Sequence, residues 1–165
     1  MLDKKYFSHV REELLGYAVK RRGVIKDAGD AQHMAKKAIF AMQRDGAKEA
    51  AELLVQAENI LIDLNEKNKK EPGIFEEGSY KAALEEYIEA YLFHQYLENK
   101  TIGKLLKIKV DPDIFISGLC DVPGELLRYA IKSATERNYE EVKRCREVAG
   151  EIIGELIDKI GRAHV

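Results

Sequence analysis

The chain has 165 residues, 34% of them charged and 45% hydrophobic, which suits one globular domain and excludes a disordered segment. The formal net charge of −2 gives no attraction of the whole chain to polyanions. No apolar run approaches the roughly 18 residues of a membrane span, and the first residues lack the hydrophobic segment of a secretion signal. We therefore expect a single domain over residues 1–165, cytoplasmic and without a membrane partner.

Charge is unevenly distributed along the chain. The first 48 residues hold eleven basic and six acidic side chains, so this third is basic and the remainder acidic. Such asymmetry permits contact with nucleic acid, although solvated helix faces explain it equally well. The two cysteines lack Cys-x-x-Cys spacing, which favours a reducing compartment. We expect Cys120, which lies in an apolar run, to be a small core residue.

Apolar residues recur at helical spacing through the first half of the chain. The pattern predicts helices over residues 2–24, 27–44 and 47–65. Whether Arg22-Gly23 interrupts the first of these stays open. The polar segment 66–73, which ends in Pro72-Gly73, is predicted to be a loop.

The second half continues in the same way, with a helix from residue 76 or 79 to 98 and a short linker or helix over 101–109. Asp111 is a suitable N-cap for a helix that starts at Pro112 and reaches about residue 136. Either Pro123 kinks this helix or Asp121 caps a second one there, and we favour one kinked helix. Asn138 could cap a last helix over 139–160. No β-alternation occurs, so the predicted fold is all-α, a bundle of about six helices.

Glu86 and Glu89 are three residues apart and share a helix face. Phe93, Tyr96 and other apolar residues lie on the same side. Acids in an apolar stripe cost free energy unless they are paired, protonated or bound to a cation. The pair is therefore a candidate site, unless both side chains reach solvent at the edge of the stripe.

Asp121 and Glu125 are four residues apart and also share a face. Their companions include Arg128 and Lys132, so a solvated ladder of acids and bases is a strong alternative for this pair. If the two pairs face each other on antiparallel helices, the four carboxylates could hold one or two Mg²⁺ or Mn²⁺ ions. Such a centre can activate water for attack on a phosphodiester.

Other catalytic patterns are missing or incomplete. The sequence contains no phosphate-binding P-loop, no Gly-x-Ser-x-Gly and no dinucleotide fingerprint. No histidine follows a candidate glutamate by three residues, as a ferritin-like di-iron centre requires. All-helical nucleotide pyrophosphohydrolases use Glu-x-x-Glu followed by Glu-x-x-Asp, and here only the first half fits.

Three segments, in order, resemble the translin family and are closest to its translin-associated factor X branch. They are KKAIF followed by QR at residues 36–44, EYIEA followed by F at 86–93, and ISGLCDVPGELLRYAIKSAT at 116–135. The likeness runs from about residue 11 to 158. It is strongest at residues 86–93 and 117–135.

This resemblance implies an all-helical fold that assembles into closed, barrel-like octamers with an internal surface for nucleic acid. It also implies Mg²⁺-dependent endoribonuclease activity in the factor X branch, whereas translin itself binds RNA and single-stranded DNA without the acidic centre. By position, the catalytic and metal-binding acids fall on Glu86, Glu89 and Asp121, with Glu125 as a nearby acid often grouped with them. The small chain is similar to archaeal homo-oligomeric members.

Two features depart from the family pattern. Pro123 stands where the factor X branch does not usually have proline, and a kink there could shift Asp121 relative to Glu125. The family also continues beyond the position of Asp158 with another loop and helix. We therefore expect a translin-like bundle that lacks the family's last helix.

The leading hypothesis is a metal-dependent endoribonuclease whose partners are RNA or single-stranded nucleic acid and copies of itself. The alternative is a translin-like scaffold that encloses single-stranded nucleic acid without cutting it. A helical bundle with only protein partners is a third possibility if both acid faces are solvated. Residues expected to contact phosphates are basic: Arg21, Arg22, Lys26, Lys36, Lys37, Arg44, Arg128 and Lys132.

Overall fold

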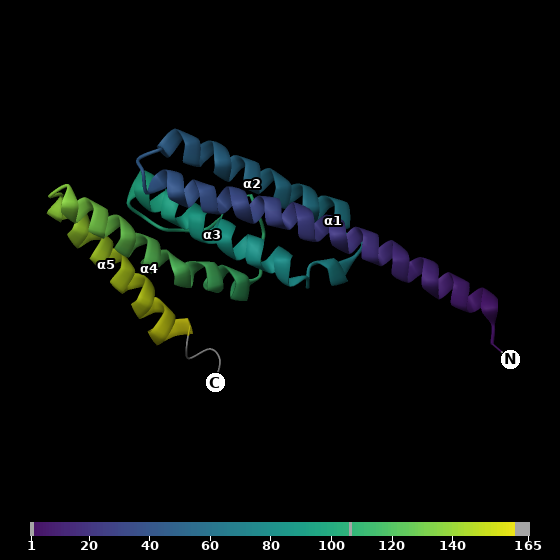
Figure 1. Ribbon diagram of the computed structural model, residues 1–165. Coiled ribbons are helices and arrows are strands. Elements are labelled where there is room, and N and C mark those ends of the chain that lie inside the picture. The colour runs from purple at the N-terminus through teal and green to yellow at the C-terminus, as the bar shows by residue number, and fades with distance from the viewer. Residues whose placement is uncertain (1, 106, 161–165) are drawn as a thin grey trace.

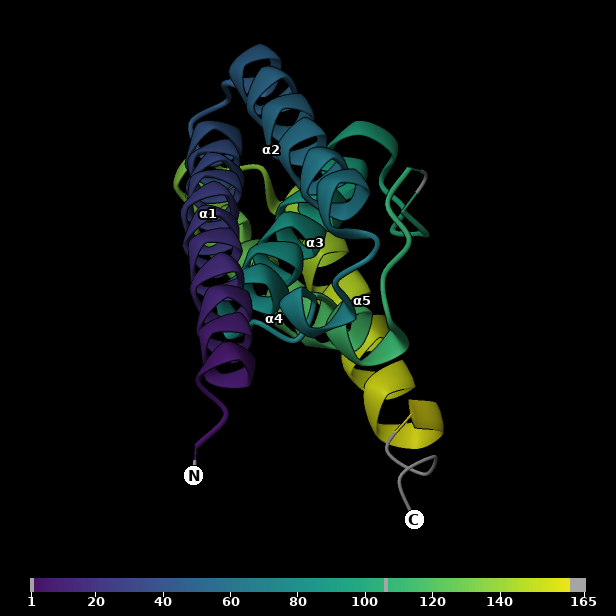
Figure 2. The same cartoon turned by 90° about the vertical axis from the view of Figure 1, so that its right-hand side faces the viewer.

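Five α-helices make up most of the protein (Figures 1 and 2). The computed structural model describes residues 2–105 and 107–160. No strand occurs in those residues, so the all-α prediction is confirmed, with five α-helices instead of about six. The helices are α1 (Lys4–Met42), α2 (Ala47–Asn68), α3 (Gly78–Asn99), α4 (Pro112–Thr135) and α5 (Tyr139–Glu155), with a 3₁₀ turn η1 (Pro72–Ile74) and a π-helical turn η2 (Leu156–Ile160).

The first two predicted helices form one continuous helix, α1. Gly23 lies inside it and does not break it. A single glycine in a helix costs only about 1 kcal/mol, and burial of Val24 and Ala28 on the following turns offsets that cost. Asp3 caps the start of α1, because its carboxylate accepts the backbone N–H groups of Lys5 and Tyr6 at 3.0 and 3.2 Å.

The first half of α1 projects beyond the other helices (Figure 1). The buried residues of α1 begin only at Val24. The projecting half nevertheless carries a series of exposed apolar side chains, a surface that soluble proteins usually cover. These are Tyr6, Phe7, Leu14, Leu15, Tyr17 and Val19, with Leu2 just before the helix.

The core lies where the second half of α1 packs against α2 and α3. Small residues at helical spacing let α1 approach its neighbours closely. Helix α3 is central: it also packs against α4, and α4 in turn packs against α5. The fully buried side chains of α1 are Ala28, Ala31, Ala35 and Ala38, and those of α3 include Ile88, Ala90, Leu92, Phe93 and Tyr96.

Helix α4 runs unbroken past Pro123, which confirms the single-helix prediction. Asp111 occupies its N-cap position, but its side chain makes no capping hydrogen bond. Asn138 does cap α5, because its Oδ1 accepts the N–H of Glu141 at 3.2 Å. The described residues of the segment 100–111 contain no helix, so this part of the chain is a linker. No helix in the described residues has the length and apolarity to cross a bilayer.

A buried carboxylate ties the linker to the core. Glu58 of α2 accepts a hydrogen bond from the Tyr87 hydroxyl at 3.0 Å and from the Lys107 ammonium at 2.7 Å. Both of its oxygens thereby gain a donor, as a buried carboxylate requires.

A second buried carboxylate, Glu141, holds α5 against the end of α3. It accepts from Tyr96 at 2.7 Å, Lys100 at 3.0 Å and Arg144 at 2.8 Å. Burial alone would raise the pKa of Glu141, but these donors and cations lower it below the ordinary value.

The expectation for Cys120 is wrong: its side chain is exposed, and Cys145 is the buried cysteine. Gly118 and Val122, two residues to either side on α4, are buried instead. Cys120 therefore points away from the core despite its apolar neighbours in the sequence. The Cys145 sulfur lies 3.2 Å from the Tyr96 hydroxyl.

Candidate functional site

Helices α3 and α4 touch at Gly118. A Cβ added at Gly118 would lie 2.7 Å from the backbone oxygen of Glu85 and 2.7 Å from Cβ of Ile88. Only glycine permits so close an approach. Glu86 and Glu89 flank this contact on α3, and Asp121 follows Gly118 by about one turn on α4. The crossing therefore brings the two predicted acid pairs together.

Electrostatic coupling among the four acids is strongest at Glu89. Burial, and next to it the negative charges of Glu86, Glu125 and Asp121, together raise the pKa of Glu89 from 4.5 to about 8, although Arg128 opposes the rise. An acid on an apolar stripe and among other acids behaves in this way. Glu89 is thus partly buried, as its place in an apolar stripe predicts, and it is coupled electrostatically to the other three acids.

Glu86 is half-buried and faces α1. Its carboxylate lies 3.4 Å from the Lys36 ammonium. Burial raises the pKa of Glu86, the Lys36 charge and hydrogen bonds from Lys36 and Gln32 oppose this rise, and the charge of Asp121 adds to it. The cation from α1 therefore favours the ionised form of Glu86.

Glu125 is buried, with 8% of its surface exposed, so the alternative of a solvated ladder does not hold for this residue. Gln43, the residue that caps the end of α1, covers it: its side-chain amide donates to Glu125 Oε2 at 2.9 Å and to the Glu125 backbone oxygen at 3.1 Å. One step of the ladder does exist, because Arg128 lies 3.4 Å from the same Oε2. Asp121, in contrast, is exposed.

The resulting site is a group of acids bordered by α1. Lys36 lies on α1, and Gln43 caps the end of that helix seven residues, or about two turns, further along. Each contacts one acid of the cluster, Glu86 or Glu125. As the side chains stand, no three His, Cys, Asp or Glu residues of the described chain are gathered closely enough to hold a metal ion.

The predicted phosphate-binding residues fall into two groups. Six of them contact other protein groups, either acids or a backbone oxygen. Lys37 and Arg44 are exposed and make no ion pair within residues 2–105 and 107–160. The contacts of the first group are Arg21 with Glu77 at 2.6 Å, Arg22 with the Ala18 oxygen at 3.2 Å, Lys26 with Asp30 at 3.5 Å, Lys36 with Glu86, Arg128 with Glu125, and Lys132 with Asp45 at 2.5 Å.

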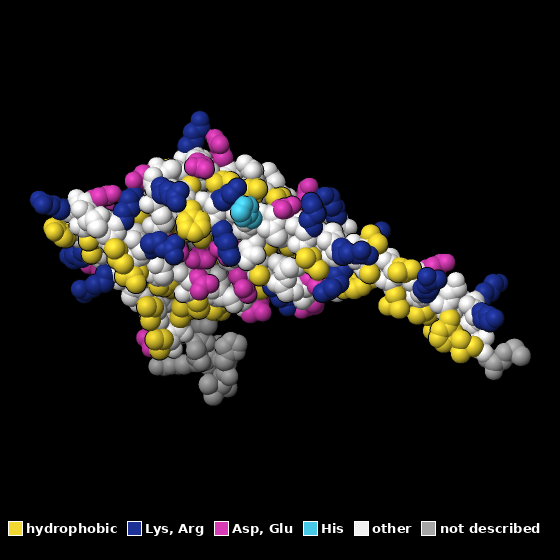
Figure 3. Space-filling model, viewed as in Figure 1, with side chains coloured by type: hydrophobic (Ala, Val, Ile, Leu, Met, Phe, Trp, Pro, Cys, Tyr) yellow, Lys and Arg dark blue, Asp and Glu magenta, His cyan; other side chains and the backbone are white. Residues whose placement is uncertain are grey.

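Charge is segregated on the face that carries the site. Figure 3 shows Lys and Arg side chains around an apolar patch over the second half of α1, with Asp and Glu side chains gathered next to them over α3 and α4. A strand of nucleic acid on this face would meet cations and acids side by side.

Gln43 is a site residue that the sequence analysis did not single out. Its bond to Glu125 spans 82 residues of sequence, so no local pattern reports it. In the sequence, only its position seven residues after Lys36, at the end of α1, could have indicated that Gln43 lies near the acids.

Comparison with known families fits this geometry. The model of the translin family matches residues 19–152. The chain belongs to the translin family. That match includes all four acids of the cluster, together with Lys36 and Gln43.

Solved structures give the same fold. The chain is similar to the structure titled apo-NeC3PO, with a TM-score of 0.84 and 22% identity over 95% of this chain and 82% of that one. The crystal structure of AfC3PO gives a TM-score of 0.84 and 23% identity over 93% of this chain and 79% of that one, and the structure of the AfC3PO complex with duplex RNA gives 0.84 and 22% over 93% and 78%. No curated protein matches the sequence. At 22–23% identity, the similarity of this translin-family chain to these structures shows a shared fold.

Proposed function

We propose that this protein is a metal-dependent endoribonuclease of the translin-associated factor X branch, similar to the archaeal homo-oligomeric members. One observation carries the proposal: Glu86, Glu89, Asp121 and Glu125 lie around the crossing of α3 and α4, where burial, together with the negative charges of the other three acids, raises the pKa of Glu89 to about 8. Negative charge concentrated in this way is destabilising unless a cation neutralises it.

The donor set suits Mg²⁺ or Mn²⁺, because these hard cations prefer carboxylate oxygens. A bound ion would supply an activated water and neutralise charge on the phosphodiester. Glu89, Asp121 and Glu86 would hold it. Glu125, which the amide of Gln43 orients, would support them. In the metal-free protein Glu89 holds a proton on its carboxyl group near neutral pH, so metal binding should release that proton.

Cations next to the acids would bind the RNA backbone. Lys36 lies at the boundary, 3.4 Å from Glu86, and could exchange this partner for a phosphate. Lys37 and Arg44 point to solvent and are open to phosphate. We therefore place the main phosphate contacts on the second half of α1 and on the turn that follows it. Arg21, Arg22, Lys26, Arg128 and Lys132 remain predicted contacts, which would first have to leave their present partners.

A non-catalytic scaffold that binds single-stranded nucleic acid is the second candidate. It is favoured by the arrangement of the acids as they stand: no three of them are gathered to hold an ion, while Lys36 and Gln43 already contact Glu86 and Glu125. In that case the acids would serve only to fix α1 against α3 and α4.

Cleavage of a labelled RNA with and without Mg²⁺ separates the two candidates. Glu89→Ala and Asp121→Asn should each lower the cleavage rate by at least about a hundredfold, since even outer-shell partners of a metal change activity 10–100-fold. Glu98→Gln, on an exposed residue of the same helix, is the matched control and should cleave as wild type does. Undiminished cleavage by both site variants would refute the assigned centre. Tight binding without cleavage by wild type would favour the scaffold.

We also propose that the protein assembles with copies of itself, as an octamer by the family resemblance. The exposed apolar side chains on the projecting half of α1, such as Leu14 and Leu15, support assembly because water contact with them is unfavourable. Light scattering should give the mass of an oligomer for wild type and a smaller mass for Leu14→Glu. A monomeric wild type would contradict the proposal.

A further inference from the structure

Phe40 holds an aromatic ring out into solvent from the second half of α1. It is 53% exposed, whereas its neighbours in the sequence, Ile39 and Ala41, face the core. Proteins that bind single strands use aromatic rings on rigid elements as platforms on which unpaired bases stack. Exposure alone does not assign this role, so the surroundings of the ring decide it.

The side chains one turn before and one turn after Phe40 are polar or cationic. Lys36 and Gln43 form one pair of residues near Phe40, and Lys37 and Arg44 form a second. Lys36 and Lys37 belong to α1, whereas Gln43 and Arg44 stand in the turn that follows Met42. The first pair borders the acidic site: Lys36 lies 3.4 Å from Glu86, and the Gln43 amide bonds to Glu125 at 2.9 Å. The ring therefore stands at the edge of the proposed catalytic centre.

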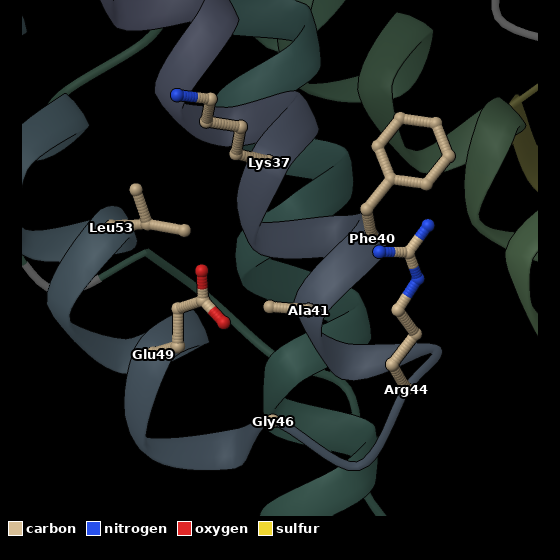
Figure 4. A pocket seen from close by; sticks show the side chains of 7 residues that line it. All are labelled: Lys37, Phe40, Ala41, Arg44, Gly46, Glu49 and Leu53. Carbon is tan, nitrogen blue, oxygen red and sulfur yellow. The ribbon is translucent and has the colours of Figure 1, made fainter.

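The second pair lines a hollow of about 460 Å³ between α1 and α2 (Figure 4). Its floor is Ala41 and Gly46, and its wall on α2 is formed by Leu53 and Glu49. In the close-up, the Phe40 and Arg44 side chains extend from the same side of α1, away from α2, and Lys37 stands at the opposite end of the hollow. The two cations outnumber the single acid and have no ion-pair partner in the described chain.

We propose that Phe40 is a stacking platform for an unpaired base of the RNA, while Lys37 and Arg44 bind the phosphates of that strand. The inference rests on the proposed function. A strand held in this way crosses α1 at Phe40, from the cationic hollow to the acids. The base on the ring then belongs to a nucleotide beside the phosphodiester that is cut.

The substrate class follows from the platform. A base inside a duplex has both faces covered by its neighbours, so only an unpaired base, or one at a duplex end, can stack on a protein ring. Phe40 should thus make the protein prefer single-stranded RNA or unpaired bases next to a helix. The cations alone would give no such preference, because phosphate contacts carry little information about pairing.

The sequence provides a direct reporter, because the chain contains no tryptophan. Phe40→Trp keeps a stacking ring and makes its fluorescence a measure of base contact. In EDTA, where the metal centre is inactive, a single-stranded RNA oligonucleotide should quench this fluorescence, and the blunt duplex of the same sequence should quench it far less. The control is Phe7→Trp, on a phenylalanine of α1 that is 52% exposed and roughly 50 Å away along the helix. It should not be quenched.

Phe40→Leu keeps an apolar side chain but removes the aromatic face. It should bind the single strand about 5- to 100-fold more weakly than wild type, from the usual strength of base–aromatic stacking. Phe40→Trp should retain the affinity, and the duplex should bind all three proteins alike. The proposal is overturned if Phe40→Leu binds the single strand as wild type does, if the single strand leaves Phe40→Trp unquenched, or if Phe40→Leu changes the mass of the assembly.

These experiments distinguish failure of the Phe40 platform from failure of the proposed endoribonuclease function. Loss of single-strand affinity in Phe40→Leu, with no cleavage by wild type in Mg²⁺, would support the platform and reject the endoribonuclease. Cleavage by wild type, with Phe40→Leu binding and cutting as well as wild type, would reject the platform and leave the acidic centre in place.

Discussion

Replacement of Glu89 by glutamine should stabilise the metal-free protein above neutral pH. The carboxyl group of Glu89 has a pKa of about 8 in the folded protein against an ordinary value of 4.5. The folded state therefore binds more protons than the unfolded state between these two values, and the free energy of unfolding of wild type falls as pH rises through this window. Glutamine mimics the protonated side chain and removes this loss.

The full shift corresponds to at most about 5 kcal/mol. Because Glu89 keeps some contact with solvent, screening reduces the effect, and we expect Glu89→Gln to gain about 1–2 kcal/mol over wild type at pH 9 and almost nothing at pH 4.5. Urea unfolding in EDTA across pH 4.5–9 would measure the gain. Glu98→Gln, on an exposed glutamate of α3, should follow wild type throughout. Parallel curves for wild type and Glu89→Gln would refute the reasoning.

Three further predictions test the packing and charge around the site. Gly118→Ala should lower the free energy of unfolding by about 1–3 kcal/mol, because its Cβ would lie 2.7 Å from α3, whereas Gly124→Ala, with nothing within 4 Å, should leave stability unchanged or raise it slightly. Equal urea midpoints for these two variants would contradict the close contact of α3 and α4. Tyr87→Phe should cost about 1–3 kcal/mol, measured by the same unfolding, because Glu58 loses a buried donor; no change would mean that this bond is unimportant. Arg44→Ala should weaken RNA binding and reduce the slope of log affinity against log salt by about one, and an unchanged slope would remove Arg44 from the phosphate contacts.

Much of the fold can be predicted from the sequence, because local patterns of residues determine where the helices form. Helical spacing of apolar residues located all five α-helices, and Asn138 was recognised as a cap from its residue type alone. The boundary near Gly23 was open because a lone glycine neither ends nor sustains a helix; burial of Val24 and Ala28 against other helices decides it. This burial depends on contacts with helices that are distant in the sequence, so a short stretch of sequence does not reveal it.

Part of the acidic site could also be predicted from local sequence patterns. Glu86 and Glu89 stood out because they interrupt an apolar stripe, and the structure places them in the half-buried position that this implies. For Glu125 the sequence left a solvated ladder open as an alternative, because Gln43, the residue that covers it, lies 82 positions earlier in the chain. The prediction for Cys120 was wrong because apolar neighbours in the sequence do not determine which way a side chain points.

Titration of the protein with Mn²⁺, followed by electron paramagnetic resonance of the free ion, tests the central claim most directly. If the four carboxylates form one metal centre, wild type should take up Mn²⁺ in stoichiometric amounts, and Mg²⁺ should compete for the site. Asp121→Asn and Glu89→Gln should lose most of this binding, while Glu98→Gln should keep it. Equal uptake by Asp121→Asn and wild type would contradict the account, because the acids at the crossing of α3 and α4 would then not be the ligands.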